Sequence, residues 1–368
     1  MRLLILLLAC CLTFIHTIAT AAEATKIDRE MQLRTTLRQQ IESAWRAGDF
    51  KTLETMGEGF VQHRSKTFNG MPELAPYFYD INALLYIDWP NEWNLVELAQ
   101  SDCHCKAPDP SHFEEADRRW DILHKKLDAW SLRYPDSTIL PVVRIKYLIR
   151  RAWFYRGGAW ADKVNPKAWP RFEQYITEAD KVVRSSTSIR FKNPAWYGDA
   201  VQVAVADDWP VEEINRLYAE MPEHAQLYTV SFENAAQFMQ PKWRGSHDAF
   251  LDMVSKAVRH APEKDGLEFY ARLYWVLLES DDKTLRMQSV GDVDRGMLEA
   301  GFDIVFKRYP ESWNFIGAAK TACKIGDAAL FERATRRLGT FDRYQGLPLT
   351  SIDCWNTDFS PTKPATAH

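Results

Sequence analysis

The sequence predicts an all-α protein, built as an irregular array of helical hairpins. Three observations lead to this prediction: apolar residues recur every three or four positions, cap-plus-proline pairs mark helix starts, and alternating apolar strands are hard to find. The composition, 46% hydrophobic and 26% charged, is that of a globular protein. We therefore expect consecutive helices folded around one large core or two smaller ones.

The first 22 residues have the layout of a secretory signal peptide. A basic start at Arg2 precedes an apolar run from Leu3 to Ile15, and small residues follow. We expect cleavage after Ala21 or Ala22, which predicts an exported protein, periplasmic or secreted. A lipoprotein signal ending at Cys10 is the alternative, although a bulky leucine stands where a small residue is usual.

The clearest helix begins at Phe113, where Ser111 and Glu114 are spaced as a capping box. Its apolar positions are Ala116, Trp120, Leu123, Leu127, Trp130 and Tyr134. Similar periodicity occurs over residues 267–278 and 298–309. These steps of three and four residues predict amphipathic helices that each bury one face.

Cap-plus-proline pairs predict further helix starts. They are Asn165-Pro166 and Asn193-Pro194, where an asparagine oxygen can accept from the first free N–H groups. Trp209-Pro210 is followed by two glutamates, which are favoured in a first helical turn.

Two pairs of similar segments indicate repeated hairpins. Arg133–Ser137 recurs as Arg308–Ser312, and Ala47–Phe50 resembles Ile325–Ala328. Glycine suits the left-handed end of one helix and aspartate caps the next, which is typical of a tetratricopeptide-like array or superhelix. We expect this domain to span residues 23–355, with loops near 65–72 and 101–111 and a disordered tail over 356–368.

Three strings in the middle of the chain are Arg156–Ala161, Pro241–Ser246 and Tyr270–Trp275, and Ser65–Gly70 precedes them. Together they resemble the hallmarks of bacterial domain-of-unknown-function family 4034 over about residues 37–275. The resemblance implies a helical, tetratricopeptide-like and often exported protein. It implies no reaction or ligand, and further hairpins are expected over residues 276–355.

The stretch Pro241–Ser246 reads as a turn between two helices. The proline ends one helix, Gly245 permits an unusual backbone angle, and the serine caps the next helix. Lys242 and Arg244 would flank a helix N-terminus, where free N–H groups attract anions.

With Arg272 nearby, this turn is a candidate site for a phosphate or carboxylate on a partner. The candidate binding residues are Lys242, Trp243, Arg244, Tyr270, Arg272 and Trp275. The structural alternative is that Trp243 packs against Tyr274 and Trp275, while the cations reach water or pair with acids.

Tryptophan is abundant, at 14 residues, which raises the question of sugar binding. The tryptophans of the family-like region are Trp153, Trp160, Trp169, Trp196, Trp209, Trp243 and Trp275. Many have helix-periodic spacing, which predicts core packing for most and leaves one or two as surface platforms.

Four cysteines remain after the leader. Because contacts in a helical array are mostly local in sequence, we expect a disulfide between Cys323 and Cys354. Cys103 and Cys105 would then pair with each other or stay free, and with His104 and His112 they also offer ligands to zinc or copper. This pattern is weak, so we predict no metal site.

The sequence contains no His-Glu-x-x-His, no Gly-x-Ser-x-Gly and no phosphate-binding glycine loop, and we predict neither catalytic residues nor a cofactor. The net charge of −4 argues against a nucleic-acid binder. We expect an exported scaffold that binds a protein or peptide along its concave face, an inhibitor of an exported toxin being one special case. The alternative is a cell-envelope glycan-binding protein or hydrolase that uses exposed tryptophans and a carboxylate.

Overall fold

The computed structural model describes residues 29–87, 96–97 and 106–338, and these are helical almost throughout. A helix over residues 29–47 comes first. The α-helices that follow are α2 (Phe50–His63), α3 (Leu74–Leu84), α4 (Phe113–Arg133), α5 (Leu140–Arg156), α6 (Trp169–Ser185), α7 (Ala195–Ala206), α8 (Val211–His224), α9 (Thr229–Phe238), α10 (His247–His260), α11 (Glu263–Leu278), α12 (Lys283–Asp292), α13 (Arg295–Arg308), α14 (Ser312–Ile325) and α15 (Ala328–Leu338). The 3₁₀ turns are η1 (Pro110–His112), η2 (Ala161–Lys163), η3 (Pro166–Ala168), η4 (Thr187–Phe191) and η5 (Pro241–Trp243). The all-α prediction is confirmed.

One small strand pair accompanies the helices. Strand β1 (Val96–Glu97) runs antiparallel to β2 (Lys106–Ala107), with Val96 opposite Ala107. Two-residue strands carry no readable alternation, so the sequence did not predict them.

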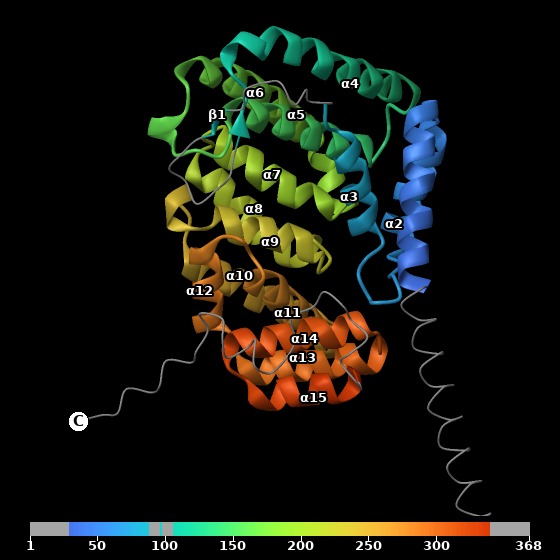
Figure 1. The fold of residues 1–368 in the computed structure, drawn as a ribbon, viewed down its shortest axis with the longest axis vertical. Coiled ribbons are helices and arrows are strands. Elements are labelled where there is room, and N and C mark those ends of the chain that lie inside the picture. The colour runs from blue at the N-terminus through green and yellow to red at the C-terminus, as the bar shows by residue number, and fades with distance from the viewer. Residues whose placement is uncertain (1–28, 88–95, 98–105, 339–368) are drawn as a thin grey trace, which may run out of the picture.

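The helices stack into an array that runs from α4 at one end to α15 at the other (Figure 1). One row, which we call the inner row, consists of α5, α7, α9 and α11, each packed on the next. Helices α6, α8 and α10 pack against this row from outside, and α13 and α14 continue it. Neighbouring helices in the sequence are therefore mostly neighbours in space, as expected for hairpin repeats.

Inner and outer helices differ in how their apolar residues are distributed. In α7, residues 195–201 and 203–205 are all buried, as expected for a helix covered on all sides. The outer helix α8 buries Ile214, Leu217, Tyr218 and Met221, a single face with helical spacing. Of the three segments with amphipathic periodicity, those in α4 and α13 bury one face. The expectation of one buried face is wrong for residues 267–278, because α11 belongs to the inner row and is buried almost all round.

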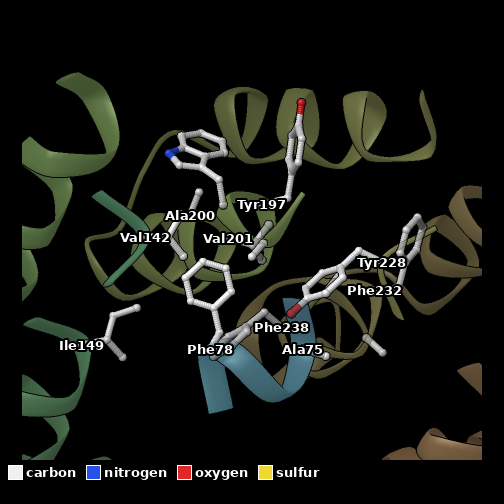
Figure 2. Packing of buried hydrophobic residues seen from close by; sticks show 14 of the residues in the cluster. Ala75, Phe78, Val142, Ile149, Tyr197, Ala200, Val201, Tyr228, Phe232 and Phe238 are labelled. Atoms are coloured by element: carbon white, nitrogen blue, oxygen red, sulfur yellow. The ribbon is translucent and has the colours of Figure 1, made fainter. Parts of the chain in front are cut away.

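Helix α3 covers part of the inner row on its other side. Figure 2 shows Ala75 and Phe78 of α3 among Val142 of α5, Ala200 of α7 and Phe232 of α9. Phe78 is 3% exposed, and α3 is buried around most of its circumference. The chain's own N-terminal region therefore occupies a surface that the array would otherwise leave open.

The helix ends follow the repeated punctuation of the sequence. Tyr134 after α4 and Tyr309 after α13 have nearly the same backbone angles, φ −133°, ψ 68° and φ −135°, ψ 74°. Gly48 and Gly326 are both left-handed at φ 68°. The aspartates that follow these glycines accept hydrogen bonds from the first turns of α2 and α15. Both predicted echoes are therefore structural repeats.

Two local predictions are wrong. Helix α4 has no side-chain cap from Ser111 with Glu114, because Asp109 instead caps η1 by accepting from the Ser111 N–H. In the turn after α9 it is Arg244, and not Gly245, that has the left-handed backbone, with φ 62°. Glycine is needed at 245 because a Cβ there would overlap the backbone of Met239. Ser246 caps α10 as predicted, accepting from Ala249 N–H at 3.2 Å.

The buried apolar residues form one cluster that extends from Leu37 to Leu338. Among residues 29–87, 96–97 and 106–338, every helix is too short or too polar to span a bilayer. The predicted leader over 1–22 and the predicted tail over 356–368 lie outside the described residues.

Candidate binding site

A cavity of about 1020 Å³ lies where the N-terminal part of the described chain, α2 and the loop over residues 64–73, meets the region from α8 to α13. Its walls come from α2, the loop over residues 64–73, the α8–α9 turn, the α10–α11 junction and the end of α13. We call this loop the closing loop, because it contacts helices about 200 residues later in the chain.

The closing loop is held in shape by its own hydrogen bonds. Thr67 N–H donates to Met71 O at 2.8 Å, and Gly70 N–H donates to Thr67 O at 2.9 Å. The side-chain oxygen of Asn69 accepts from the Thr67 hydroxyl at 2.5 Å and from Met71 N–H at 3.2 Å. Gly70 has φ 84°, a conformation that strongly favours glycine.

The tip of the closing loop is fixed to α11 and α14 through one carbonyl. Asn69 O accepts from Arg272 Nη2 at 2.9 Å and from Asn314 Nδ2 at 3.0 Å. A Cβ on Gly70 would overlap the Arg272 guanidinium and lie 2.6 Å from the Tyr309 ring. Only glycine lets the loop approach these helices this closely.

A single buried carboxylate organises the charges on this wall. Glu268 on α11, 3% exposed at its side chain, pairs with Lys66 at 3.1 Å, Arg272 at 3.1 Å and Arg308 at 2.8 Å. Burial alone would raise the pKa of Glu268, but Arg272, Lys66 and Arg308 outweigh it and hold that pKa below its usual value. Glu268 is therefore ionised, and its carboxylate forms ion pairs with Lys66, Arg272 and Arg308.

Tyr309 lies at the centre of the same group. Lys66 Nζ is 5.4 Å and the Arg272 guanidinium 5.3 Å from the centroid of its ring. Both distances fit cation–π contacts, which add to the ion pairs. The repeated Arg-Tyr-Pro punctuation, at its second occurrence, is thus part of the cavity wall.

Arg64 is the cation on this wall that the structural network does not use. It lines the cavity, is exposed, and makes no ion pair or side-chain hydrogen bond with any residue in the described ranges. Its backbone is left-handed, with φ 49° and ψ 35°. Asp208, Gln226, Leu227 and Arg244 are also non-glycine residues with positive φ, so this conformation is not peculiar to Arg64.

The remaining walls are largely apolar and aromatic. Phe60, Phe191 and Phe269 line the cavity, with Phe191 51% exposed at its mouth. Tyr228 is buried, and burial raises the pKa of its hydroxyl, which therefore stays protonated and able to donate. No tryptophan lines this cavity.

The residues predicted from the turn at 241–246 make local contacts. Lys242 Nζ pairs with Asp282 at 2.5 Å, and Arg244 pairs with Asp208. The Trp243 ring contacts Phe238 and Trp153, with centroids 5.6 and 6.4 Å away. The interpretation that Trp243 packs against Tyr274 and Trp275 is wrong, because the turn faces the α5 side of the array. The turn thus meets the end of α5, near the Arg156–Ala161 string.

The three candidates on α11 point in different directions. The Tyr270 hydroxyl accepts from Asp294 N–H at 2.8 Å, and Trp275 packs against Phe302 and Trp313. Only Arg272 reaches the cavity. The structure therefore does not bring the six predicted binding residues together.

Most tryptophans belong to the core, as expected. Trp196, Trp209 and Trp275 are at most 8% exposed, and Trp153, Trp169 and Trp243 are partly buried. Trp160 and Trp313 are the exposed ones in the described part of the chain, at 63% and 54%.

The cysteine predictions fall mainly outside the described residues. Cys103 and Cys105 lie there, and so does Cys354. Cys323 on α14 is disulfide-bonded, and its pairing with Cys354 stays a prediction. Among the described residues, no group of three histidine, cysteine or acidic side chains is arranged to hold a metal ion.

Sequence reasoning missed most of the cavity's charged residues. Arg64, Glu268 and Arg308 were not among the candidates. Two signals pointed toward them: the string Ser65–Gly70, and the second occurrence of the Arg-Tyr-Pro echo at Arg308. Neither signal shows that the two segments meet in space.

In comparisons with known proteins, the chain matches no family model, no curated protein and no solved structure. The similarity to family 4034 therefore stays a prediction, and the function must be argued from the cavity itself.

Proposed function

We propose that this protein is an exported helical-repeat scaffold that binds a protein or peptide partner in the cavity beside the closing loop. The observation that carries this proposal is Arg64, an exposed cation without a partner among the described residues, set in a cavity with phenylalanine walls. A few polar groups on an otherwise apolar concave surface are what binding sites generally present.

The packing of the inner row favours binding in the cavity beside the closing loop over binding along the whole concave face, which the sequence analysis expected. Because α3 already packs on part of the inner row, that surface is not free along its whole length. The cavity lies next to α3 and keeps an open mouth at Phe191. The partner is therefore expected at one end of this surface.

Site-specific photo-cross-linking in the cells that make the protein tests the proposal. A benzoylphenylalanine replacing Phe191, at the mouth of the cavity, should give a discrete cross-linked protein. The matched control replaces Leu132 on α4, which is 85% exposed and does not line the cavity. Equal products at both positions, or none at Phe191, would reject the proposal.

A second candidate rests on the exposed indoles of Trp160 and Trp313, whose faces could stack on sugars. Digestion with muramidase before analysis separates the two candidates. A protein product at Phe191 persists after digestion, whereas wall fragments bound through Trp160 or Trp313 are lost on digestion and on substitution of those tryptophans by alanine.

Export, the bridge between Cys323 and Cys354 and the relation to family 4034 are parts of the same proposal. Mass spectrometry of the secreted or periplasmic protein checks the first two, through a mature N-terminus at Ala22 or Glu23 and a Cys323–Cys354 cross-linked peptide.

A further inference from the structure

The charges around the cavity are unequal on the wall formed by the closing loop, α11 and α13. Four cations lie there, Arg64, Lys66, Arg272 and Arg308, and the carboxylates that face them are Asp265 and Glu268. The third lining carboxylate, Glu223, is on α8, 74% exposed, and lies 4.0 Å from His224. Among the lining residues, this wall therefore has four cations against two carboxylates. Two nearby carboxylates outside the lining, Glu73 and Glu30, accept from the Ser65 hydroxyl and from Asn69 N–H.

The ion pairs do not remove this excess of cations among the lining residues. Glu268 is shared by three cations, and Asp265 pairs only with Arg308, at 2.6 Å. Arg64 has no carboxylate partner in the described part of the chain. An anion entering the cavity would therefore meet a cation whose hydrogen-bond donors are unused and whose guanidinium can grip a carboxylate in a bidentate way.

The size of the cavity and its apolar walls indicate which kind of ligand bears the anionic group. At about 1020 Å³, the cavity is at the upper limit of small-molecule sites. Phe60, Phe191 and Leu227 offer surface that a small inorganic or dicarboxylate anion would leave uncovered. A peptide segment supplies both a carboxylate and apolar side chains.

We propose that the cavity binds a peptide segment through a carboxylate, held by Arg64 at the end of α2, with apolar side chains of the peptide against Phe60 and Phe191. This inference rests on the proposed function and specifies the chemistry of the partner. The carboxylate is either a C-terminus or an aspartate or glutamate side chain, and the test below distinguishes these two sources.

Fluorescence anisotropy with labelled nonapeptides of random sequence tests the inference on the purified full chain. Peptides with two net negative charges should bind, while C-terminally amidated neutral and basic peptides that contain no aspartate or glutamate should not. Each acidic peptide is measured as a free acid and as a C-terminal amide. Binding that amidation abolishes identifies a C-terminal carboxylate; binding that survives identifies a side chain.

Two glycine variants give a matched comparison. Arg64→Gly and Arg244→Gly each remove one exposed arginine from a left-handed position, and only the first lines the cavity. Arg64→Gly should weaken binding of acidic peptides about tenfold or more, whereas Arg244→Gly should leave it unchanged. Because glycine suits the left-handed backbone, Arg64→Gly should unfold at the same or higher denaturant concentration, which excludes misfolding as the cause.

The inference is overturned if acidic peptides bind no better than the amidated peptides without a carboxylate, if no set binds, or if Arg64→Gly binds like the natural chain. Its failure is distinguishable from failure of the proposed function. A partner cross-linked at Phe191 that is captured equally by Arg64→Gly would keep the scaffold and reject the carboxylate site.

Discussion

Two arginines in this chain hold a left-handed backbone directly after a helical segment, Arg64 after α2 and Arg244 after η5. A glycine follows in each turn, Gly70 six residues after Arg64 and Gly245 directly after Arg244. A Cβ added at either glycine would overlap other atoms. The two turns differ in what they contact. The charged groups of the closing loop reach partners about 200 residues away, whereas the ion pairs of the turn at 241–246 join residues at most 40 positions apart. The Trp243 ring in that turn also meets Trp153 on α5.

This difference shows why similar residue patterns give different surfaces. Lys242 and Arg244 each find one acidic partner on a neighbouring element, so their charges are balanced locally. Arg64 and Lys66 lie in the closing loop, which contacts α11 and α14. There Lys66, Arg272 and Arg308 share Glu268, and Arg64 has no carboxylate partner among the described residues. The closing loop therefore carries a cation without a carboxylate partner in the described part of the chain, whereas the charges of the turn at 241–246 serve the structure.

The largest expected effect comes from Glu268→Gln. Removing the charge leaves Lys66, Arg272 and Arg308 without their shared carboxylate, and Arg272 is 8% exposed. We expect the free energy of unfolding to fall by about 3–5 kcal/mol in urea titrations. Asp208→Asn, which breaks the exposed pair with Arg244, should change it by less than about 1 kcal/mol. Equal effects would mean that the two turns do not differ energetically.

The same carboxylate predicts a pH dependence. The pKa of Glu268 is lower in the folded than in the unfolded chain, so its stabilisation is complete above the unfolded value of about 4.3. It is lost as the pH falls through the folded pKa. Thermal unfolding between about pH 5 and pH 3 should therefore lose stability more steeply for the natural chain than for Glu268→Gln. Parallel curves would contradict the assignment.

Gly70→Ala tests the close approach of the closing loop. The alanine would have to keep the backbone φ of 84°, which is unfavourable for a residue with a Cβ. Its Cβ would also displace the Arg272 or Tyr309 side chain. We expect a loss of about 2–4 kcal/mol, measured by urea unfolding. Gly59→Ala in α2, where a Cβ would meet nothing within 4 Å, is the control and should be neutral or stabilising by up to about 1 kcal/mol.

Trp243→Ala tests whether the local turn is structural. Its ring packs on Phe238 and Trp153, so removal should leave a partly filled gap and lower the free energy of unfolding by about 2–3 kcal/mol. Peptide binding by the folded fraction should stay unchanged. If the variant keeps its stability and loses binding, the turn is a binding site after all.

The smallest effect is expected from Ser246→Ala, which removes the cap of α10 at the same turn. Loss of the hydrogen bond to Ala249 N–H should lower stability by about 1 kcal/mol. Ser246→Asp, which keeps an accepting oxygen, should restore it. Failure of aspartate to do so would show that backbone contacts of Gly245, and not the cap, fix this turn.

The helices and many of their ends could be predicted because their signals are local. Gly48 with Asp49, Asn193 with Pro194 and the two Arg-Tyr-Pro segments each act within a few residues. Choices between two nearby caps were less secure, as Asp109 and Ser111 show, because both residue types accept from the same N–H groups.

The site could not be predicted in the same way. Lys66 and Glu268 are 202 positions apart, and nothing in the spacing of either segment says which helix faces meet. Arg64 looks like an ordinary charge at a helix end, and only its left-handed backbone and its lack of a partner among the described residues distinguish it. The pairing of distant elements depends on how the whole array curves, which no local pattern encodes.

The contact between Asn69 and Asn314 also has a consequence for the order of folding during synthesis. The hairpins between them can form one after another as they emerge, because their contacts are local. Asn69 must wait for a helix 245 residues later, which takes about 10–50 s at the usual rate of translation. The contacts of Asn69 with α11 and α14 therefore form late, after the hairpins between them.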